Sequence, residues 1–136
     1  HICSIFLWIL RDWNQKGLDL NINDALNDIT IKRLIKVFDY VEENYSQNIC
    51  VQDAARLCNM SYSYFSRFFK AVMKKSFNEY LNYIRITSAE KLLTTSSLNI
   101  TQIAQEVGFS SSSYFVFQFK NYKCITPKQY RKLLKV

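Results

Sequence analysis

Glycine and proline are scarce in this sequence, which has two glycines and one proline among 136 residues. Turns between β-strands draw heavily on these two residue types, so the sequence has little material for hairpins or a sheet. Apolar residues make up 49% of the chain, which is enough to bury the core of one or two small domains. The sequence therefore predicts an all-α fold.

Histidine and closely paired cysteines are also lacking. His1 is the single histidine, and Cys3, Cys50, Cys58 and Cys124 show no CxxC spacing. A histidine-based metal site and a Ser-His-Asp triad cannot be assembled from this sequence, and it has no glycine-rich phosphate loop. We accordingly expect neither an enzyme nor a bound metal or cofactor. The wide cysteine spacing suits reduced thiols in a cytoplasmic protein.

Acidic residues are few in the second part of the chain. Residues 50–136 hold 13 basic and 4 acidic side chains, whereas residues 1–49 hold 5 basic and 7 acidic ones. The formal net charge of +7 is therefore concentrated in one region. Such an excess favours a polyanionic partner such as nucleic acid, because phosphate neutralisation dominates nucleic-acid affinity. Solubility is the alternative explanation.

The same plan occurs twice in the basic region, at residues 51–73 and 100–122. In each copy an alanine, Ala55 or Ala104, is followed four residues later by Asn59 or Gly108. Asparagine and glycine tolerate the left-handed backbone that ends a helix sharply. A serine and an aromatic-rich helix ending in Phe-Lys follow. The repeat predicts two helix-turn-helix motifs.

The two copies differ in the length of their turns. The alanines are 49 residues apart, whereas Lys70 and Lys120, which end the two Phe-Lys pairs, are 50 apart. The second turn is therefore expected to have one extra residue. Ser61 and Ser110 are the serines expected to cap the second helix of each motif.

The first thirty residues are predicted to lie outside the repeat. Residues 1–16 are expected to form an apolar helix, which would be too short to span a membrane. It is an ordinary helix packed on this domain, the last helix of an absent upstream domain, or a dimerisation helix. Residues 17–30 are rich in Asn and Asp and are expected to be a linker. An amphipathic helix should follow from Ile31, with Thr30 as its cap.

One long helix, residues 76–95, is expected to join the two motifs. Its roughly twenty residues would span about 30 Å, close to the roughly 34 Å repeat of DNA. Arg85 lies among apolar residues of this helix and is expected to make internal hydrogen bonds or an ion pair. After the second motif, Thr126 should cap a final helix that starts with Pro127. Tyr130, Leu133 and Leu134 should close the core.

The second helix of each motif carries the candidate DNA contacts. Short hydroxyl side chains let a helix lie deep in the major groove, and Arg67 can pair with O6 and N7 of guanine. Phe117 stands in the place of Arg67, so the second motif should discriminate less, through thymine methyl groups and serine hydrogen bonds. The side chains expected to face inward are Phe65, Phe68, Phe69, Val72, Phe115 and Phe119. The residues expected at the phosphate backbone are Ser61, Tyr62, Lys70, Lys74, Lys75, Ser111, Tyr114, Gln118, Lys120 and Lys123.

From residue 31 to residue 136 the sequence resembles the AraC/XylS family of bacterial transcription regulators. The resemblance rests on IA-x-x-VGFS at residues 103–110, SSYFVFQFK at residues 112–120 and TP-x-x-YR at residues 126–131. These motifs combine Ala104, Gly108, Phe119, Pro127 and Tyr130 at set spacings.

The resemblance implies an all-helical domain with two helix-turn-helix subdomains that bind double-stranded promoter DNA in the bacterial cytoplasm, with no membrane attachment. It also implies contact with RNA polymerase, usually for activation, and a homodimer formed through an upstream effector-binding domain. Placed by position, the base contacts fall on Ser63, Ser66, Arg67, Ser112, Ser113 and Phe117. An architectural or protein-interaction module with the same fold is the alternative. The operator sequence, the effector and the choice between activation and repression stay open.

Overall fold

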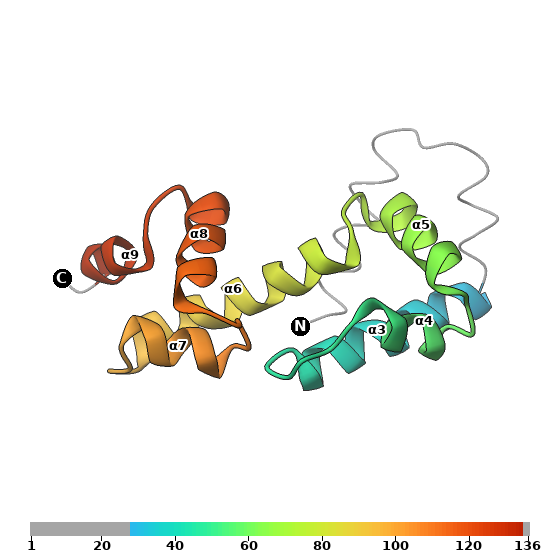
Figure 1. Ribbon diagram of the computed structural model, residues 1–136, viewed down its shortest axis with the longest axis horizontal. Coiled ribbons are helices and arrows are strands. Elements are labelled where there is room, and N and C mark those ends of the chain that lie inside the picture. Colours follow the sequence, from blue (N-terminus) through green and yellow to red (C-terminus); the bar gives the residue numbers. More distant parts are fainter. Residues whose placement is uncertain (1–27, 135–136) are drawn as a thin grey trace. The chain divides into compact units, whose positions relative to one another are not determined.

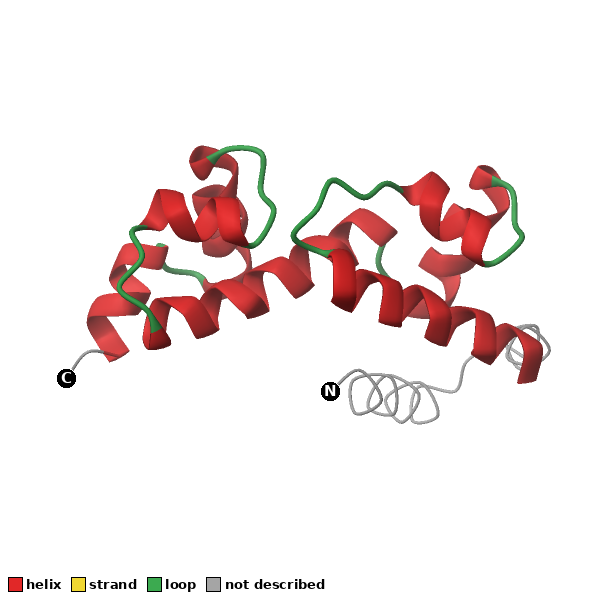
Figure 2. Ribbon diagram, turned by 90° about the horizontal axis from the view of Figure 1, so that it is seen from below, coloured by secondary structure: helices red, strands yellow, loops and turns green. Residues whose placement is uncertain are grey.

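The computed structural model describes residues 28–134, and every regular element in this range is a helix (Figures 1 and 2). The all-α prediction is therefore confirmed for this range, while the helix expected at residues 1–16 lies outside it. None of the described helices is long and apolar enough to cross a bilayer. The elements are α3 (Asp28–Asn44), α4 (Val51–Leu57), α5 (Tyr62–Met73), α6 (Phe77–Thr95), α7 (Ile100–Glu106), α8 (Ser112–Lys123) and α9 (Pro127–Leu134).

Helix α3 begins earlier than the sequence predicted. Its first residue is Asp28, so Thr30 lies inside the first turn and is not the cap. The first three residues of α3 also fall within the segment 17–30 that was expected as a linker. The apolar periodicity starts only at Ile31 because it marks the buried face of the helix, and the backbone hydrogen bonds begin before that face does.

The chain forms two compact units, and the first comprises residues 28–43 and 49–77 of the described range. Its core joins the apolar face of α3 to the aromatic face of α5. Phe69 packs edge-on against Phe38 of α3 with ring centroids 6.5 Å apart, and against Phe77 at 5.7 Å. Phe65 is fully buried in the same core. Burying each such ring contributes about 1.5–3 kcal/mol.

The second unit comprises residues 44–48 and 78–134 of the described range. Its core is one apolar cluster drawn from α6, α7, α8 and the turn before α8. Three contacts between aromatic rings lie in this cluster. The ring centroids are 5.2 Å apart for Phe109 and Phe115, 5.8 Å for Phe115 and Phe119, and 5.4 Å for Phe119 and Tyr130 of α9. The buried members are Ile86, Ala89, Leu93, Ile103, Ala104, Val107, Phe109, Phe115 and Phe119.

Arg85 of α6 holds residues 44–48 within the second unit. Its Nε donates to the backbone oxygen of Tyr45 at 2.8 Å, and its Nη2 donates to that of Gln47 at 2.9 Å. The guanidinium carbon also lies 5.8 Å from the centre of the Phe109 ring. Burial lowers the pKa of Arg85, and an electrostatic interaction with Tyr114 opposes this shift. The expected internal role of Arg85 is confirmed.

Helix α9 starts as predicted and ends differently. Thr126 caps it, with its Oγ1 accepting from the backbone N–H of Gln129 at 3.2 Å. Tyr130 packs against the core, but Leu133 and Leu134 are 66% and 53% exposed. The prediction that these two leucines close the core is wrong, because helical spacing from Tyr130 identifies a shared face without showing what covers it.

Candidate nucleic-acid interface

Each unit contains one helix-turn-helix, formed by α4 and α5 in the first and by α7 and α8 in the second. The first turn comprises residues 58–61 and the second comprises residues 107–111, so the extra residue in the second turn is confirmed. Ser61 caps α5 and Ser111 caps α8, each accepting from the backbone N–H three residues on. The expected cap Ser110 is wrong, because the extra residue moves the capping position to Ser111.

Both turns leave the first helix through a left-handed residue, as predicted. Asn59 has a φ of 53° and Gly108 a φ of 99°. The backbone N–H of the next residue donates to the backbone oxygen of the buried alanine. In the first motif Met60 donates to the oxygen of Ala55 at 3.0 Å. In the second motif the equivalent bond runs from residue 109 to residue 104 at 2.9 Å. This six-residue closure satisfies carbonyl groups that the ended helix would leave unpaired.

The first helix of each motif begins with a cap that pairs with the residue three positions on. Asn99 accepts from the N–H of Gln102 at 2.8 Å and donates its own N–H to the Gln102 side chain at 2.9 Å, which confirms the expected capping box. In the first motif the thiol and the N–H of Cys50 donate to Asp53 at 3.2 and 3.3 Å. These bonds hold the pKa of Asp53 below its usual value.

Helix α5 presents a polar surface above its aromatic core. Phe65 and Phe69 are fully buried, whereas Ser63 and Arg67 are exposed and Ser66 is half-buried. The Nε of Arg67 donates to the backbone oxygen of Ser63 at 3.4 Å, and the side chain is exposed. The predicted inward position of Phe68 is only partly correct. Its ring is partly buried and lies parallel to exposed Tyr64, 6.3 Å away.

Helix α8 presents a more apolar surface. Phe115 and Phe119 are buried as predicted, and Phe117, in the place of Arg67, is 60% exposed. Ser113 is exposed beside it, and Ser112 is half-buried. A helix with this surface can contact apolar groups in a groove but offers no guanidinium for guanine.

The residues expected at the phosphate backbone fall into two groups. Tyr62, Lys70 and Lys120 are exposed, and their side chains make no hydrogen bond or ion pair with another residue in the range 28–134. Others already take part in the fold. Lys123 forms an ion pair with Glu90 at 2.6 Å, and the hydrogen bond to Glu90 raises the pKa of Lys123.

The remaining expected backbone contacts are also partly engaged within the protein. The Tyr114 hydroxyl accepts from Asn82 of α6 at 3.1 Å. Ser61 and Ser111 accept cap hydrogen bonds through their oxygens, and each hydroxyl proton is left to donate. Lys74 is exposed, and Lys75 and Gln118 are half-buried.

Two helix ends in these motifs have a left-handed residue that the sequence did not suggest. Lys74 ends α5 with a φ of 62°, and Cys124 ends α8 with a φ of 67°. They occupy equivalent positions, 50 residues apart. Neither lysine nor cysteine favours this conformation, so both positions carry backbone strain. Within residues 28–134 no three His, Cys, Asp or Glu side chains gather as metal ligands do.

This geometry agrees with known proteins. A family model described as "Helix-turn-helix domain" matches residues 54–133. Regulatory protein PocR of Salmonella typhimurium is 34% identical over 99 residues, which cover 73% of this chain and 33% of PocR. The chain thus spans about a third of the length of that relative.

Solved structures show the same fold. A transcriptional regulator of Chromobacterium violaceum, described as having an AraC-type DNA-binding domain, is 27% identical with a TM-score of 0.71, covering 80% of this chain and 97% of that one. The DNA-binding domain of AdpA, solved in complex with a target DNA, is 25% identical with a TM-score of 0.70, covering 74% and 91%.

Proposed function

Because the chain belongs to the AraC/XylS family of DNA-binding transcription regulators, we propose that α5 and α8 enter successive major grooves of one promoter site. The observation that carries this proposal is the pair of exposed helix faces described above. Each lies on the second helix of a helix-turn-helix motif, the helix that enters the major groove in such proteins.

The first motif supplies most of the sequence discrimination in this proposal. Arg67 donates two hydrogen bonds to O6 and N7 of a guanine, and Ser63 and Ser66 contact neighbouring bases. Lys70, Lys74 and Lys75 lie toward the other end of α5, where charged side chains anchor the phosphate backbone. Backbone anchors set the orientation of the helix and carry no sequence information.

The second motif reads its site differently. Phe117 contacts thymine methyl groups, while Ser112 and Ser113 make hydrogen bonds to bases. Lys120 is the exposed cation of α8 and contacts phosphate. The site for this protein should therefore consist of two unequal boxes about one helical turn apart.

The rest of the proposed function concerns parts of the protein beyond these motifs. Activation through RNA polymerase, a location in the bacterial cytoplasm and a homodimer are the properties that the family resemblance implies. The domain division that goes with them places residues 1–16 at the end of an upstream effector-binding domain and residues 31–136 in the DNA-binding domain. The formal charge of +7 supports binding to DNA.

The test is selection of binding sites from random duplexes, followed by variants. Arg67→Ala should weaken binding to the selected site by about 1–3 kcal/mol and relax the preference at one base pair. Lys70→Ala is the matched control, because loss of a phosphate contact weakens all sequences similarly. Equal loss of specific and non-specific binding by Arg67→Ala would show that Arg67 does not read a base.

Binding to a protein through aromatic helices is the second candidate. Tyr64 and Phe117 are 56% and 60% exposed, and aromatic rings of this kind are common in protein–protein interfaces. Salt dependence separates the two functions. Binding to duplex DNA must weaken steeply as salt is added, whereas a protein-binding module would have no comparable affinity for DNA.

A further inference from the structure

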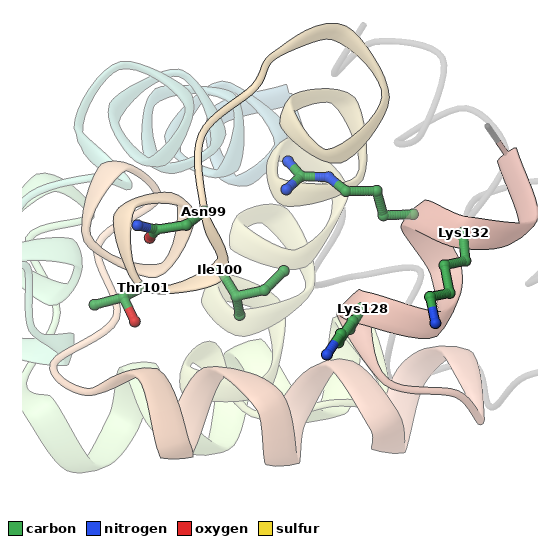
Figure 3. Close-up of a pocket in the computed structure, with 6 residues that line it drawn as sticks. Asn99, Ile100, Thr101, Lys128 and Lys132 are labelled. Carbon is green, nitrogen blue, oxygen red and sulfur yellow. The ribbon is translucent and has the colours of Figure 1, made fainter.

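An open groove of about 650 Å³ lies in the second unit between the start of α7 and helix α9 (Figure 3). Asn99, Ile100 and Thr101 form one wall, and Lys128 and Lys132 extend from α9 on the other. Arg131 completes the lining. Three of these six side chains are cations and none is acidic, so the groove suits an anionic ligand.

The walls of the groove are held by hydrogen bonds within the unit. Arg131 donates through Nε to the oxygen of Leu93 at 3.2 Å, which ties α9 to the end of α6. Asn99 uses its side-chain oxygen in the capping box, so its amide nitrogen is the group left to donate. With the Thr101 hydroxyl and two ammonium groups, the groove offers mainly donors. Phosphodiester oxygens, which only accept, match this set.

The positive charge of α9 is specific to the second copy of the repeat. At the repeat offset of 50 residues, Lys128 and Lys132 correspond to Asn78 and Asn82, and Arg131 corresponds to Leu81. Uncharged side chains serve the first copy at the positions of the two lysines, so the repeated fold does not itself require Lys128 and Lys132 to be charged. The copy with the added cations is also the one in which Phe117 of α8 occupies the position equivalent to Arg67 of α5.

We propose that this groove binds the sugar-phosphate backbone of DNA next to the box contacted by α8. The inference rests on the proposed function and adds a backbone contact to it. Lys128 and Lys132 donate to phosphate oxygens there, and this sequence-independent attraction offsets the weaker base readout of the second motif. Both lysines are exposed, and neither makes an ion pair with a carboxylate of the described range.

The experiment compares the 136-residue protein with the double variant Lys128→Gln/Lys132→Gln on the selected duplex. Affinity is measured by fluorescence anisotropy over a series of salt concentrations. Loss of two phosphate contacts should reduce the slope of log affinity against log salt by about 1.8, and should weaken binding roughly tenfold or more at low salt. The base preference should stay unchanged. Lys91→Gln, an exposed lysine of α6 outside the groove, is the matched control and should alter the slope by less.

A second measurement locates the contact on the DNA. Duplexes shortened stepwise from the end next to the α8 box should abolish the difference between the wild-type protein and the double variant. A wild-type slope in the double variant would overturn the proposal, as would a changed base preference. Normal DNA binding combined with lost binding to a polyglutamate peptide would also overturn it, and would assign the groove to an acidic protein. A wild-type protein that binds no duplex would instead refute the proposed function itself.

Discussion

Gly108 is the turn residue whose replacement most directly tests the packing of the second motif. A Cβ at this position would lie 2.6 Å from the backbone oxygen of Tyr45 and 2.9 Å from the Cα of Ser46. The oxygen would have to retreat by about 0.8 Å to reach ordinary contact. The left-handed backbone adds about 1–2 kcal/mol for a residue with a Cβ, and overpacking typically adds about 1–3 kcal/mol. We therefore expect Gly108→Ala to lower the free energy of unfolding by about 2–5 kcal/mol.

The cost of this substitution should depend on Arg85. The guanidinium bonds to the backbone oxygens of Tyr45 and Gln47 at 2.8 and 2.9 Å, so it opposes the retreat of the loop. In an Arg85→Ala background the loop can move, and Gly108→Ala should cost less. A double-mutant cycle should give a coupling free energy of about 1 kcal/mol or more between Gly108 and Arg85.

The assay is urea unfolding followed by circular dichroism for the wild-type protein, both single variants and the double variant. Asn59→Gly is the control in the first motif, where the backbone is already left-handed with a Cβ present. It should change stability by about 0.5 kcal/mol or less, since relief of strain and added chain entropy oppose each other. A change of the same small size for Gly108→Ala would refute the steric argument. Equal costs in the two Arg85 backgrounds would refute the role given to Arg85.

Three further predictions concern the helix ends and one ion pair. Lys74→Gly should raise the free energy of unfolding by about 0.5–1 kcal/mol by relieving a left-handed lysine, while weakening DNA binding at all sequences; an unchanged melting temperature would contradict the strain. Cys50→Ala should raise the pKa of Asp53 toward its ordinary 3.8 in an NMR titration, because the thiol bond is the largest cause lowering it. Since a lowered carboxyl pKa stabilises the fold above the unfolded value, wild-type stability should fall more steeply than that of the variant as the pH drops below about 4. Glu90→Gln should lower the pKa of Lys123 and cost about 0.5–1 kcal/mol at low salt, and less at high salt; a cost independent of salt would contradict the ion-pair explanation.

Local features of the fold could be predicted because they depend on neighbouring residues. The left-handed turns at Asn59 and Gly108 follow from the backbone freedom of those residue types. The longer second turn follows from the change of repeat offset, and the cap at Asn99 follows from its spacing to Gln102. Each of these requires information from only a few consecutive residues.

Contacts between distant residues could not be predicted in the same way. The internal role of Arg85 was expected from its apolar neighbours, but its partners are backbone oxygens about forty residues earlier, which have no sequence signature. The strain at Lys74 was missed because lysine is not a residue that signals a left-handed turn. The exposure of Leu133 was missed because periodicity does not show whether another element covers a face.

The candidate site was predictable in part for the same reason. Helical periodicity separated the buried rings of α5 and α8 from the exposed Arg67 and Phe117 correctly. It could not show that Lys123 already pairs with Glu90, or that Lys128 and Lys132 line a groove with α7. Those arrangements depend on how α6, α7, α8 and α9 pack, and the residue spacing within one helix does not show this.

Residues 44–48, the last residue of α3 and the four that follow it, belong to the second unit, although they precede both helices of the first motif in the chain. No single cleavage can therefore release an intact C-terminal half. A fragment beginning at residue 78 would leave the guanidinium of Arg85 without its two acceptors and Gly108 without the loop beside it. Supplying a short peptide that spans residues 44–48 in trans should restore part of the lost stability. This segment is therefore a suitable place to split the protein for complementation.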